Sequence, residues 1–343
     1  MKKVGIITFY SSNNYGALLQ AYSLSKKIRE LSADVSFVFF EDAPKQESIP
    51  ANIPPFIRKV KEESNIRNQN FDSFREQYLP GVRFYPDIDN DFDIFVVGSD
   101  QVWNRDIVGP DDRFFLSFAS DSKKASYAAN FGKVNGGGTD EETLSSLLYG
   151  FGDRISVRET SGADYLSQIM NHDITVSLDP TLLTKKEDWL PFLEESVDEP
   201  YLLFIMLQND MKLIKKAEAL ATEKNLRLRL LTVSYFPPAG FEPWSRVSVP
   251  HYLNMINNAS YVVTSSFHGL AFSLIFQKQF EVWPLQGNMA DRNGRMTDLL
   301  KSLGLSHRIE NGNSTIDYTE VSESIATMRT KSLEYLKKII LGE

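Results

Sequence analysis

The sequence predicts an α/β protein made of two halves, each with a parallel sheet covered by helices. In the first half, apolar, β-branched runs alternate with longer segments whose apolar side chains recur at helical spacing. The same alternation starts again after residue 200. Parallel strands need helical crossovers and are buried on both faces, so this order of elements is typical of them. We therefore expect two similar α/β domains that face each other.

The first half opens with the buried run Val4–Tyr10, then a polar loop, then the amphipathic segment Tyr15–Leu31. These features predict a strand followed by a helix. Further strands are predicted at Val35–Phe40, Phe92–Val97, Ala125–Asn130 and Ile155–Val157, and further helices at Ile53–Tyr78 and Glu141–Leu148, the latter capped by Thr139 or Asp140.

A proline-containing, charge-rich stretch at Leu178–Pro200 is typical of a linker. We accordingly expect one domain over 1–185 and a second over 186–343, which a C-terminal helix closes. In the second half, strands are predicted at Tyr201–Leu207, Leu226–Val233, Tyr261–Thr264 and Phe280–Leu285, and helices at Met211–Glu223, Tyr252–Asn258, Leu270–Gln277, Met296–Leu303 and Val321–Ile340.

The composition excludes several function classes. The 343 residues include 37 Lys and Arg against 45 Asp and Glu, a net charge of −8, which disfavours general nucleic-acid binding. The chain has no cysteine, so disulfides, thiolate nucleophiles, Cys-ligated zinc and iron–sulfur clusters are ruled out. The four histidines show no HExxH spacing, and no metal site is predicted.

Membrane and export signals are weak in this sequence. No apolar run approaches the ~18 residues of a membrane span. The N-terminal apolar run is short and lacks the cleavage site of a signal peptide. We expect a cytoplasmic protein, and the sequence does not define its oligomeric state.

The most informative polar cluster is Thr264–Gly269, between a buried strand and an apolar helix. Ser265 or Ser266 can cap this helix, whose free N–H groups favour an anion. His268 in the first turn can donate a hydrogen bond or a proton. The alternative is that the serine only caps and the histidine only packs.

Arginines follow two other predicted elements. Arg158 lies just past a short strand, where its guanidinium could hold a carboxylate or phosphate, or could pair with Glu159 or Asp153. Arg292 and Arg295 bracket a helix start and either face solvent or reach a cleft.

Two further loops come after predicted strands. Ser99, Asp100, Gln101 and Trp103 follow one strand, and a carboxylate such as Asp100 can act as a general base. Asn13, Asn14 and Tyr15 follow another strand. Because ligands of open α/β sheets bind at the carboxyl ends of strands, both loops are predicted to face a cleft or its acceptor. Either loop can instead be a turn or a helix entry, and Trp103 can belong to the core. The chain has no GxGxxG or GxxxxGK[ST] motif for a dinucleotide or nucleotide phosphate.

Taken together, several segments resemble the polysaccharide pyruvyl transferase family, and their order and spacing span almost the whole chain. They are Gly5–Leu24, Phe92–Asn104, Ser126–Gly132, Ile155–Glu159, Leu178–Leu183, Tyr261–Phe276 and Gly294–Leu305.

The resemblance implies a GT-B-like fold of two Rossmann-like domains with parallel sheets facing a central cleft. It implies transfer of a pyruvyl group from phosphoenolpyruvate to sugar hydroxyls, forming a ketal, in polysaccharide or exopolysaccharide biosynthesis for the cell envelope. It implies no cofactor beyond the donor substrate. The acceptor is a sugar or lipid-linked glycan, which suggests peripheral contact with membrane-bound glycan machinery.

The resemblance also suggests site residues. It places Arg158 and His268 at the donor. Relatives carry an arginine where this chain has Ser266, so we expect Arg295, or failing that Arg292, to supply the missing charge. His268 is then the candidate acid and Asp100 the candidate base.

Two alternatives keep the fold and change the function. A glycosyltransferase would bind a nucleotide sugar and needs a carboxylate for the ribose, for which Glu281 is the candidate. A binding protein within a glycan-assembly complex would need no chemistry at all.

Overall fold

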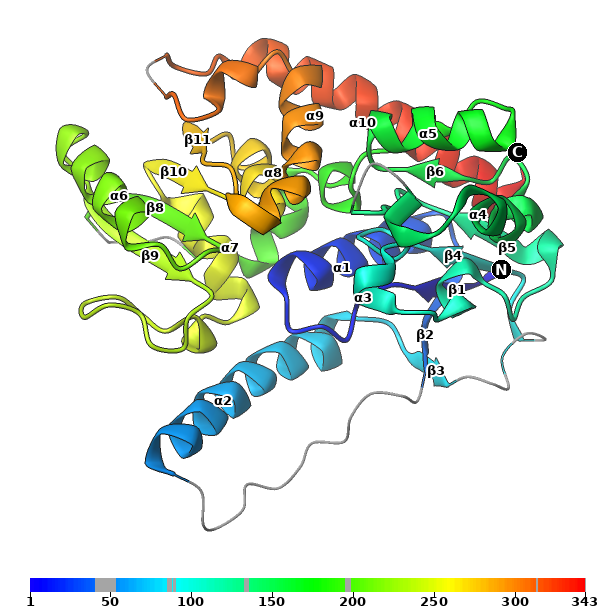
Figure 1. Cartoon of the computed structure of the whole chain (residues 1–343), viewed down its shortest axis with the longest axis horizontal. Coiled ribbons are helices and arrows are strands. Elements are labelled where there is room, and N and C mark those ends of the chain that lie inside the picture. Colours follow the sequence, from blue (N-terminus) through cyan, green and yellow to red (C-terminus); the bar gives the residue numbers. More distant parts are fainter. Residues whose placement is uncertain are drawn as a thin grey trace.

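The computed structural model describes residues 1–40, 54–84, 88, 91–132, 136–194, 199–312 and 314–342. Two parallel sheets, one from each half of the chain, stand side by side with helices around them (Figure 1). The predicted α/β class with two parallel sheets is confirmed. Ile53, at the start of one predicted helix, and residues 195–198 of the predicted linker lie outside the described residues.

The N-terminal sheet is parallel throughout, with the strand order β3-β2-β1-β4-β5. Its central strands are buried, which explains their nearly continuous apolar sequences. The bounds are β1 (Lys3–Ile7), β2 (Asp34–Phe39), β3 (Val82–Phe84), β4 (Ile94–Val97) and β5 (Lys124–Ser126), and the separate parallel pair is β6 (Ser156–Val157) with β7 (Thr175–Val176).

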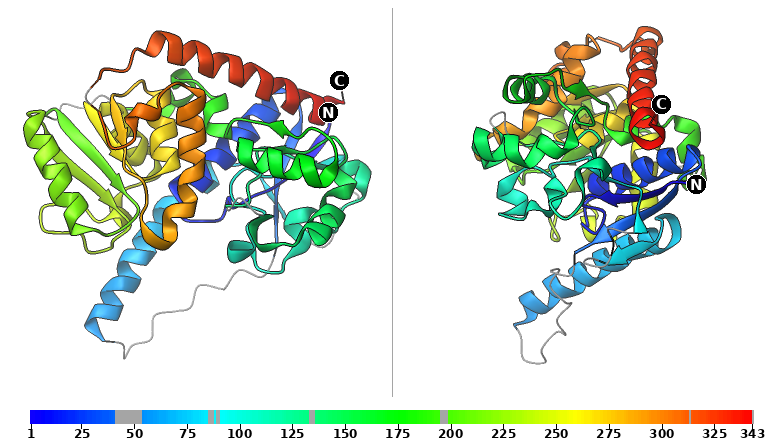
Figure 2. Two further views of the ribbon diagram at one scale, coloured as in Figure 1. Left: turned by 45° about the horizontal axis from the view of Figure 1, so that its top comes forward. Right: turned by 90° about the vertical axis from the view of Figure 1, so that its right-hand side faces the viewer.

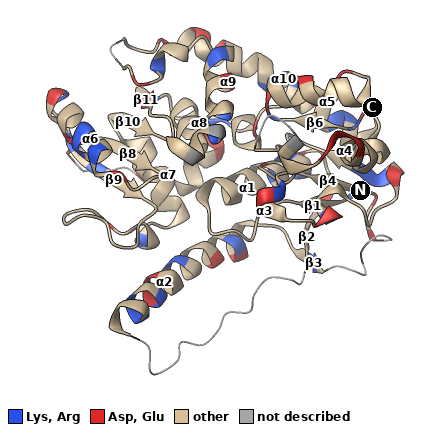
Figure 3. Ribbon diagram, in the orientation of Figure 1, with Lys and Arg blue, Asp and Glu red and all other residues tan. Residues whose placement is uncertain are grey.

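Local signals explain where the helices of this half begin. The Asn14 side chain accepts a hydrogen bond from Ala17 N at the start of α1, and Pro55 occupies the first turn of α2. α2 projects from the body, and charges of both signs are spread along it (Figure 3). The bounds are α1 (Tyr15–Glu30), α2 (Pro55–Tyr78), α3 (Arg105–Val108), α4 (Glu141–Leu148) and α5 (Thr160–Met170).

The C-terminal sheet is also parallel, with the order β11-β10-β8-β9. Its bounds are β8 (Tyr201–Met206), β9 (Arg227–Thr232), β10 (Tyr261–Thr264) and β11 (Phe280–Val282). The helices of this half are α6 (Met211–Glu223), α7 (Val249–Asn258), α8 (Phe267–Ile275), α9 (Gly294–Ser302) and α10 (Tyr318–Leu341).

Some predicted bounds were wrong for identifiable reasons. The strand predicted to reach Asn130 ends at Ser126, because Ala128 has a positive φ of 48° that no strand accommodates. α7 begins at Val249, before the predicted start at Tyr252, because Ser248 caps it and Pro250 fits a first helical turn.

The stretch predicted as a linker is a packed connection in its described part. Leu182, Leu183 and Trp189 are fully or almost fully buried in the same core as α1 and α8. Two of its three prolines, Pro180 and Pro191, stand in 3-10 helices, which the composition alone could not distinguish from a loose linker.

The last helix, α10, runs back along both halves (Figure 2). Leu178 N donates to Ser332 Oγ (3.0 Å), and the Tyr335 hydroxyl donates to Ser126 O (2.9 Å). The C-terminal element therefore ties the second sheet's half to the first.

The two halves also share one hydrophobic core. The rings of Tyr15 and Tyr252 stack at 4.4 Å across the junction, and the Tyr15 hydroxyl donates to Val247 O at 2.5 Å. Arg67, 3% exposed, lies 3.3 Å from the centre of the Trp244 ring. These contacts fix the positions of the two sheet edges on either side of the candidate site.

Candidate functional site

A cavity of about 270 Å³ lies where the carboxyl ends of the two sheets face each other. We call it the front cavity. Ligands of open α/β sheets bind at such strand ends. Residues from the N-terminal half include Asn14, Tyr15, Asp100 and Gln101, and those from the C-terminal half include Ser265, Ser266, His268, Arg292 and Arg295.

His268 is held at the junction between the two halves. The Ser266 side chain caps α8 by accepting from Gly269 N (3.3 Å), which places His268 in the first turn. A Cβ on Gly16 would lie 1.9 Å from His268 Nδ1, so only glycine lets α1 approach the ring this closely. Sequence reasoning left open whether Ser265 or Ser266 caps, and the structure assigns Ser266.

Asp179 is the residue that connects the candidate groups, and sequence reasoning did not select it. It is 1% exposed, and its Oδ2 lies 3.5 Å from His268 Nε2 and 2.8 Å from Arg158 Nη1. Burial by itself would raise the pKa of Asp179, but the close contacts with His268 and Arg158 hold it well below its usual range. Asp179 thus stays ionised and orients both neighbours.

Arg158 is buried in the wall of the site rather than exposed at its edge. Its partners are Asp179 and, at 3.7 Å from Nη2, Asp100 Oδ1, not the Glu159 or Asp153 considered from sequence. Burial lowers the pKa of Arg158, but these carboxylates outweigh burial, and the net pKa is raised. Arg158 is 8% exposed and paired with a buried carboxylate, so it is part of the buried interior although it follows a strand end.

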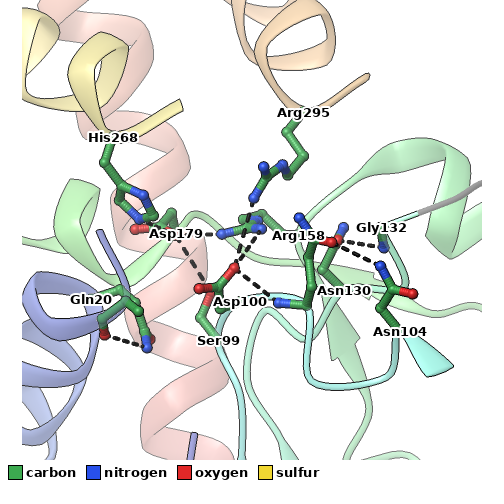
Figure 4. A network of polar contacts seen from close by, with 12 residues as sticks. Gln20, Ser99, Asp100, Asn104, Asn130, Gly132, Arg158, Asp179, His268 and Arg295 are labelled. Carbon is green, nitrogen blue, oxygen red and sulfur yellow. Dashed lines mark hydrogen bonds and ion pairs between the residues drawn. The ribbon is translucent and has the colours of Figure 1, made fainter. Parts of the chain in front are cut away.

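Arg295 reaches the same cluster from α9. Its Nη1 lies 3.7 Å from Asp100 Oδ1, the oxygen that also faces Arg158 (Figure 4). Burial, together with the Arg158 charge, lowers the pKa of Arg295 to about 10. The structure therefore brings Arg158, Arg295 and His268 around two carboxylates.

Phe267 forms an apolar partition beside these charges. The guanidinium carbons of Arg158 and Arg295 lie 4.9 and 5.6 Å from its ring centre. Behind Arg158, burial raises the pKa of Glu159, whose Oε1 accepts a hydrogen bond from Asn130 Nδ2. The site therefore combines low exposure with several ionisable groups, as candidate catalytic sites do.

Asp100 has an unusual backbone. Its φ is +76°, in the left-handed region that non-glycine residues seldom adopt, and its Oδ1 accepts from Gln101 N at 2.9 Å. The conformation turns the carboxylate towards both arginines. Such outliers cluster at functional sites.

Three residues predicted to face the cleft do not line the cavity. Trp103 is fully buried and its indole nitrogen donates to Phe114 O (3.0 Å), so it belongs to the core. Ser99 is also fully buried, with its Oγ 3.4 Å from Asp179. Asn13 bonds to Asn68 and Arg75, because α2 packs over its loop.

The other predicted loop residues reach the cavity with their side chains already engaged. Asn14 caps α1, Tyr15 bridges the two halves, and the Gln101 Oε1 accepts from Asn104. Ser265 Oγ accepts from Leu207 N at 2.9 Å. Arg292 also lines the cavity but is exposed, at its outer edge.

Asp179 carried a signal that could have been used. It lies in the Leu178–Leu183 segment, which follows β7 and supplies a carboxylate before a proline. The segment was predicted to be the beginning of a linker, so Asp179 was not selected. Its partners Arg158 and His268 are distant in sequence, and no local pattern connects them to it.

The comparison with protein families decides the assignment. The family model described as polysaccharide pyruvyl transferase matches residues 14–280, well over half of the chain. The chain belongs to the polysaccharide pyruvyl transferase family. The matched range contains Asp100, Arg158, Asp179 and His268, whereas Arg295 lies beyond it.

Two solved structures are similar to this chain over nearly its whole length, and the first of them supports the fold. A UDP-GlcNAc 2-epimerase from Methanocaldococcus jannaschii, in complex with UDP-GlcNAc and UDP, superimposes with a TM-score of 0.50 at 12% identity, covering 99% of this chain and 100% of the epimerase. The Streptomyces sp. SF2575 glycosyltransferase SsfS6 covers 99% of this chain and 95% of its own, at 11% identity and a TM-score of 0.38. The fold is GT-B-like, with two Rossmann-like halves.

No curated protein matches the chain in sequence. Among the helices that the structure describes, none has the length and apolarity to cross a bilayer.

Proposed function

We propose that this protein transfers the pyruvyl group of phosphoenolpyruvate to two hydroxyls of a sugar, forming a ketal and releasing phosphate. Membership of the family supports the reaction class. The contacts around the front cavity support an anionic donor.

Buried nitrogens without a hydrogen-bond partner carry this proposal. Within the described residues, Arg158 Nε and Nη2, Arg295 Nε and His268 Nε2 are buried without a hydrogen-bond partner. Arg295 and His268 line the front cavity, and Arg158 lies behind them on Asp179. Buried donors are normally satisfied, and leaving one unmet costs about 1–3 kcal/mol. A ligand rich in acceptor oxygens meets this need, and phosphoenolpyruvate carries both a carboxylate and a phosphate.

The reaction then needs one acid and one base. A proton delivered to the methylene carbon of the donor, with His268 as the candidate acid, leaves positive character on the neighbouring carbon. The oxygen of a sugar hydroxyl bonds to that carbon and passes its proton to a base, for which Asp100 is the candidate. The carbon–oxygen bond to phosphate breaks as the second hydroxyl attacks, and the second hydroxyl proton leaves with the phosphate.

The remaining charged groups position the acid His268 and the base Asp100. Asp179 orients His268 and Arg158, and Arg158 and Arg295 hold Asp100 between them. Ser265, Ser266 and the start of α8 face the same cavity, where free N–H groups favour an anion. We propose Arg295 as the residue that replaces the arginine of relatives, with Arg292 as an outer contact.

The acceptor is proposed to enter between the sheets, where Tyr15 and Trp244 line the front cavity with polar loop residues. Aromatic faces beside polar groups suit a sugar. We propose a sugar or lipid-linked glycan of cell-envelope polysaccharide synthesis as the acceptor class, with the protein acting in the cytoplasm.

The nucleotide-sugar alternative is weakened by Glu281. Its two carboxylate oxygens already accept from the Tyr261 hydroxyl (3.0 Å) and Trp283 Nε1 (2.9 Å), and it does not line the front cavity. It is not free to bind a ribose.

Thermal shift with phosphoenolpyruvate, UDP and UTP separates the candidates. We expect phosphoenolpyruvate to raise the melting temperature and UDP and UTP not to. Incubation with phosphoenolpyruvate and a panel of glycosides should then release phosphate and give the methyl NMR signal of a pyruvate ketal.

A stabilising effect of UDP alone would favour the glycosyltransferase instead. No effect of any of the three ligands would favour a non-catalytic binding protein. Asp164→Asn, on the exposed face of α5, is a suitable control for both experiments because its side chain lines neither the front cavity nor the network around Asp179.

A further inference from the structure

A second cavity lies on the other side of the Phe267 partition. Its volume is about 230 Å³, and we call it the rear cavity. It is lined by the segment from β7 to Leu182, the start of α5, α9 and α10. Phe267 and Arg295 line both cavities, whereas Arg158 and Asp179 line only the rear one.

Unsatisfied polar atoms are concentrated on the residues around the rear cavity. Of nine buried side-chain nitrogen and oxygen atoms without a hydrogen-bond partner in the described part of the chain, five belong to four residues that line it. They are Arg158 Nε and Nη2, Arg295 Nε, Ser177 Oγ and Asp298 Oδ2. Ser177 is fully buried and Arg158 is 8% exposed.

The charges at this cavity favour an anion. Arg158 and Arg295 line it from within, and Lys331 of α10 lines it as an exposed residue. Asp179, one of its two acidic residues, is already engaged by Arg158, Thr181 and the facing His268. Three arginine nitrogens without a hydrogen-bond partner belong to the lining of this cavity, whereas Asp298 Oδ2 is the one buried carboxylate oxygen without a partner among its described lining residues. Asp100 Oδ1, which faces both arginines at 3.7 Å, does not line the cavity.

Asp298 narrows the choice of anion. Its Oδ2 is a buried acceptor without a donor, which repels an oxyanion that has no proton. Inorganic phosphate retains at least one O–H group at neutral pH, so it can accept from the arginines and donate to Asp298. Sulfate is fully ionised and has no proton to donate.

From this arrangement we propose that the rear cavity is a binding site for inorganic phosphate, which adjoins the front cavity at Arg295, a residue that lines both. We infer that this phosphate is the one released from phosphoenolpyruvate, and in that respect the inference rests on the proposed function. The phosphate that leaves the donor takes the proton of the second hydroxyl and becomes hydrogen phosphate. The O–H group of this ion can donate a hydrogen bond to Asp298 Oδ2. Because the Arg295 guanidinium lines both cavities, phosphate in the rear cavity competes with the donor.

The test is calorimetric titration of the protein with inorganic phosphate and with sulfate, in the absence of any donor. We expect phosphate to bind at least about tenfold more tightly than sulfate. Lys331→Met should weaken phosphate about three- to tenfold, since the exposed lysine supplies a screened charge. Asp298→Asn should bring the phosphate and sulfate affinities together, because the amide no longer requires a proton on the ligand.

Matched controls locate the site. Lys212→Met on the exposed face of α6 and Asp164→Asn on α5 remove the same charges elsewhere and should leave phosphate affinity unchanged. Arg292→Met, which alters only the front cavity, should also leave it unchanged. Melting curves of each variant show whether it is folded.

Equal phosphate and sulfate affinities in the unaltered protein, or a phosphate affinity that depends on Arg292 and not on Lys331, would overturn the proposal. The titration uses no donor and no acceptor, so its result is independent of turnover. Rear-cavity phosphate binding without consumption of phosphoenolpyruvate would leave this site standing and reject the proposed function.

Discussion

Two buried arginines in this protein have opposite hydrogen-bond environments. Arg308, fully buried beside β11, donates from Nε to Phe280 O (2.7 Å), from Nη1 to Ser314 O and from Nη2 to the Tyr261 hydroxyl (3.2 Å). Arg158, almost as buried, donates only from Nη1 to Asp179.

The difference separates a structural role from a functional one. Arg308 fixes a loop against a strand through hydrogen bonds from all three of its nitrogens, whereas Arg158 lines the rear cavity with two nitrogens, Nε and Nη2, that have no hydrogen-bond partner. A buried charge by itself therefore says little about function, and the unmet hydrogen-bonding capacity is the informative quantity.

The largest expected effect tests this contrast directly. Arg158→Lys keeps the charge but loses the planar fork that joins Asp179 to Asp100. We expect kcat/KM for phosphoenolpyruvate to fall about 10³-fold, the equivalent of about two charge-assisted hydrogen bonds. Steady-state phosphate release measures this.

Arg308→Lys is the matched substitution at the structural site. It should lower the melting temperature while calorimetry shows phosphoenolpyruvate affinity within about threefold of the unaltered protein. Equal losses of donor affinity in the two variants would contradict the assignment of a structural role to Arg308 and a functional role to Arg158.

A smaller effect is expected at His268. His268→Gln removes the proton donor but keeps a polar side chain at the start of α8, so kcat should fall about 10²-fold with a smaller change in KM. His251→Gln, at the start of α7 and outside the front cavity, serves as the control. A change confined to KM would make His268 a binding residue rather than the acid.

Arg295→Met should weaken donor binding and raise the free energy of unfolding of the free protein. We expect donor KM to rise about tenfold. Burial lowers the pKa of Arg295 to about 10, so at neutral pH the folded state bears the cost of a charged, desolvated group. Removing it should stabilise the free protein by ~1–3 kcal/mol. Denaturant unfolding measures the gain, and a loss of stability would show that Arg295 is fully satisfied.

The lowered pKa of Arg295 also predicts how donor affinity and stability change with pH. Arg295 loses its proton in the folded protein as pH rises through about 10, whereas an unfolded arginine stays charged. Donor affinity should therefore fall as pH rises through about 10, and the stability contribution of this residue should increase there. Calorimetry at pH 8 to about 10.5 should show this decline in the unaltered protein and not in Arg295→Met.

The smallest effect is expected for Arg292→Met. Arg292 is exposed at the outer edge of the front cavity, and charges there are screened. Donor KM should rise only about two- to threefold, and less in high salt. A rise in KM as large as that of Arg295→Met would contradict the proposal that Arg295 is the main donor contact and Arg292 an outer one.

Much of the fold could be predicted from local signals. Glu141–Leu148, Met211–Glu223 and Tyr261–Thr264 have the predicted bounds, because their periodicity and capping residues are contained in the segment itself. The short pair β6 and β7 was only half predicted, since the exposed Thr175–Val176 has no apolar pattern.

The candidate site was predictable only in part. Arg158, Asp100, His268 and Arg295 could be selected from polar residues at strand ends and helix starts. Asp179 could not, since its importance arises from two partners 21 and 89 positions away. Trp103 was misplaced for the converse reason, because a tryptophan after a strand looks the same whether it faces a cleft or the core.

The sequence by itself determined the parallel α/β architecture, the absence of cysteine chemistry and the family, because apolar periodicity, composition and ordered motifs are properties of the chain. Only the tertiary structure decided which charges meet. It placed Arg158 and His268 on one buried carboxylate, turned Asp100 between two arginines and left Arg308 satisfied. The physical reason is that desolvation and hydrogen-bond satisfaction depend on all neighbours of a group, and most of those neighbours are distant in sequence.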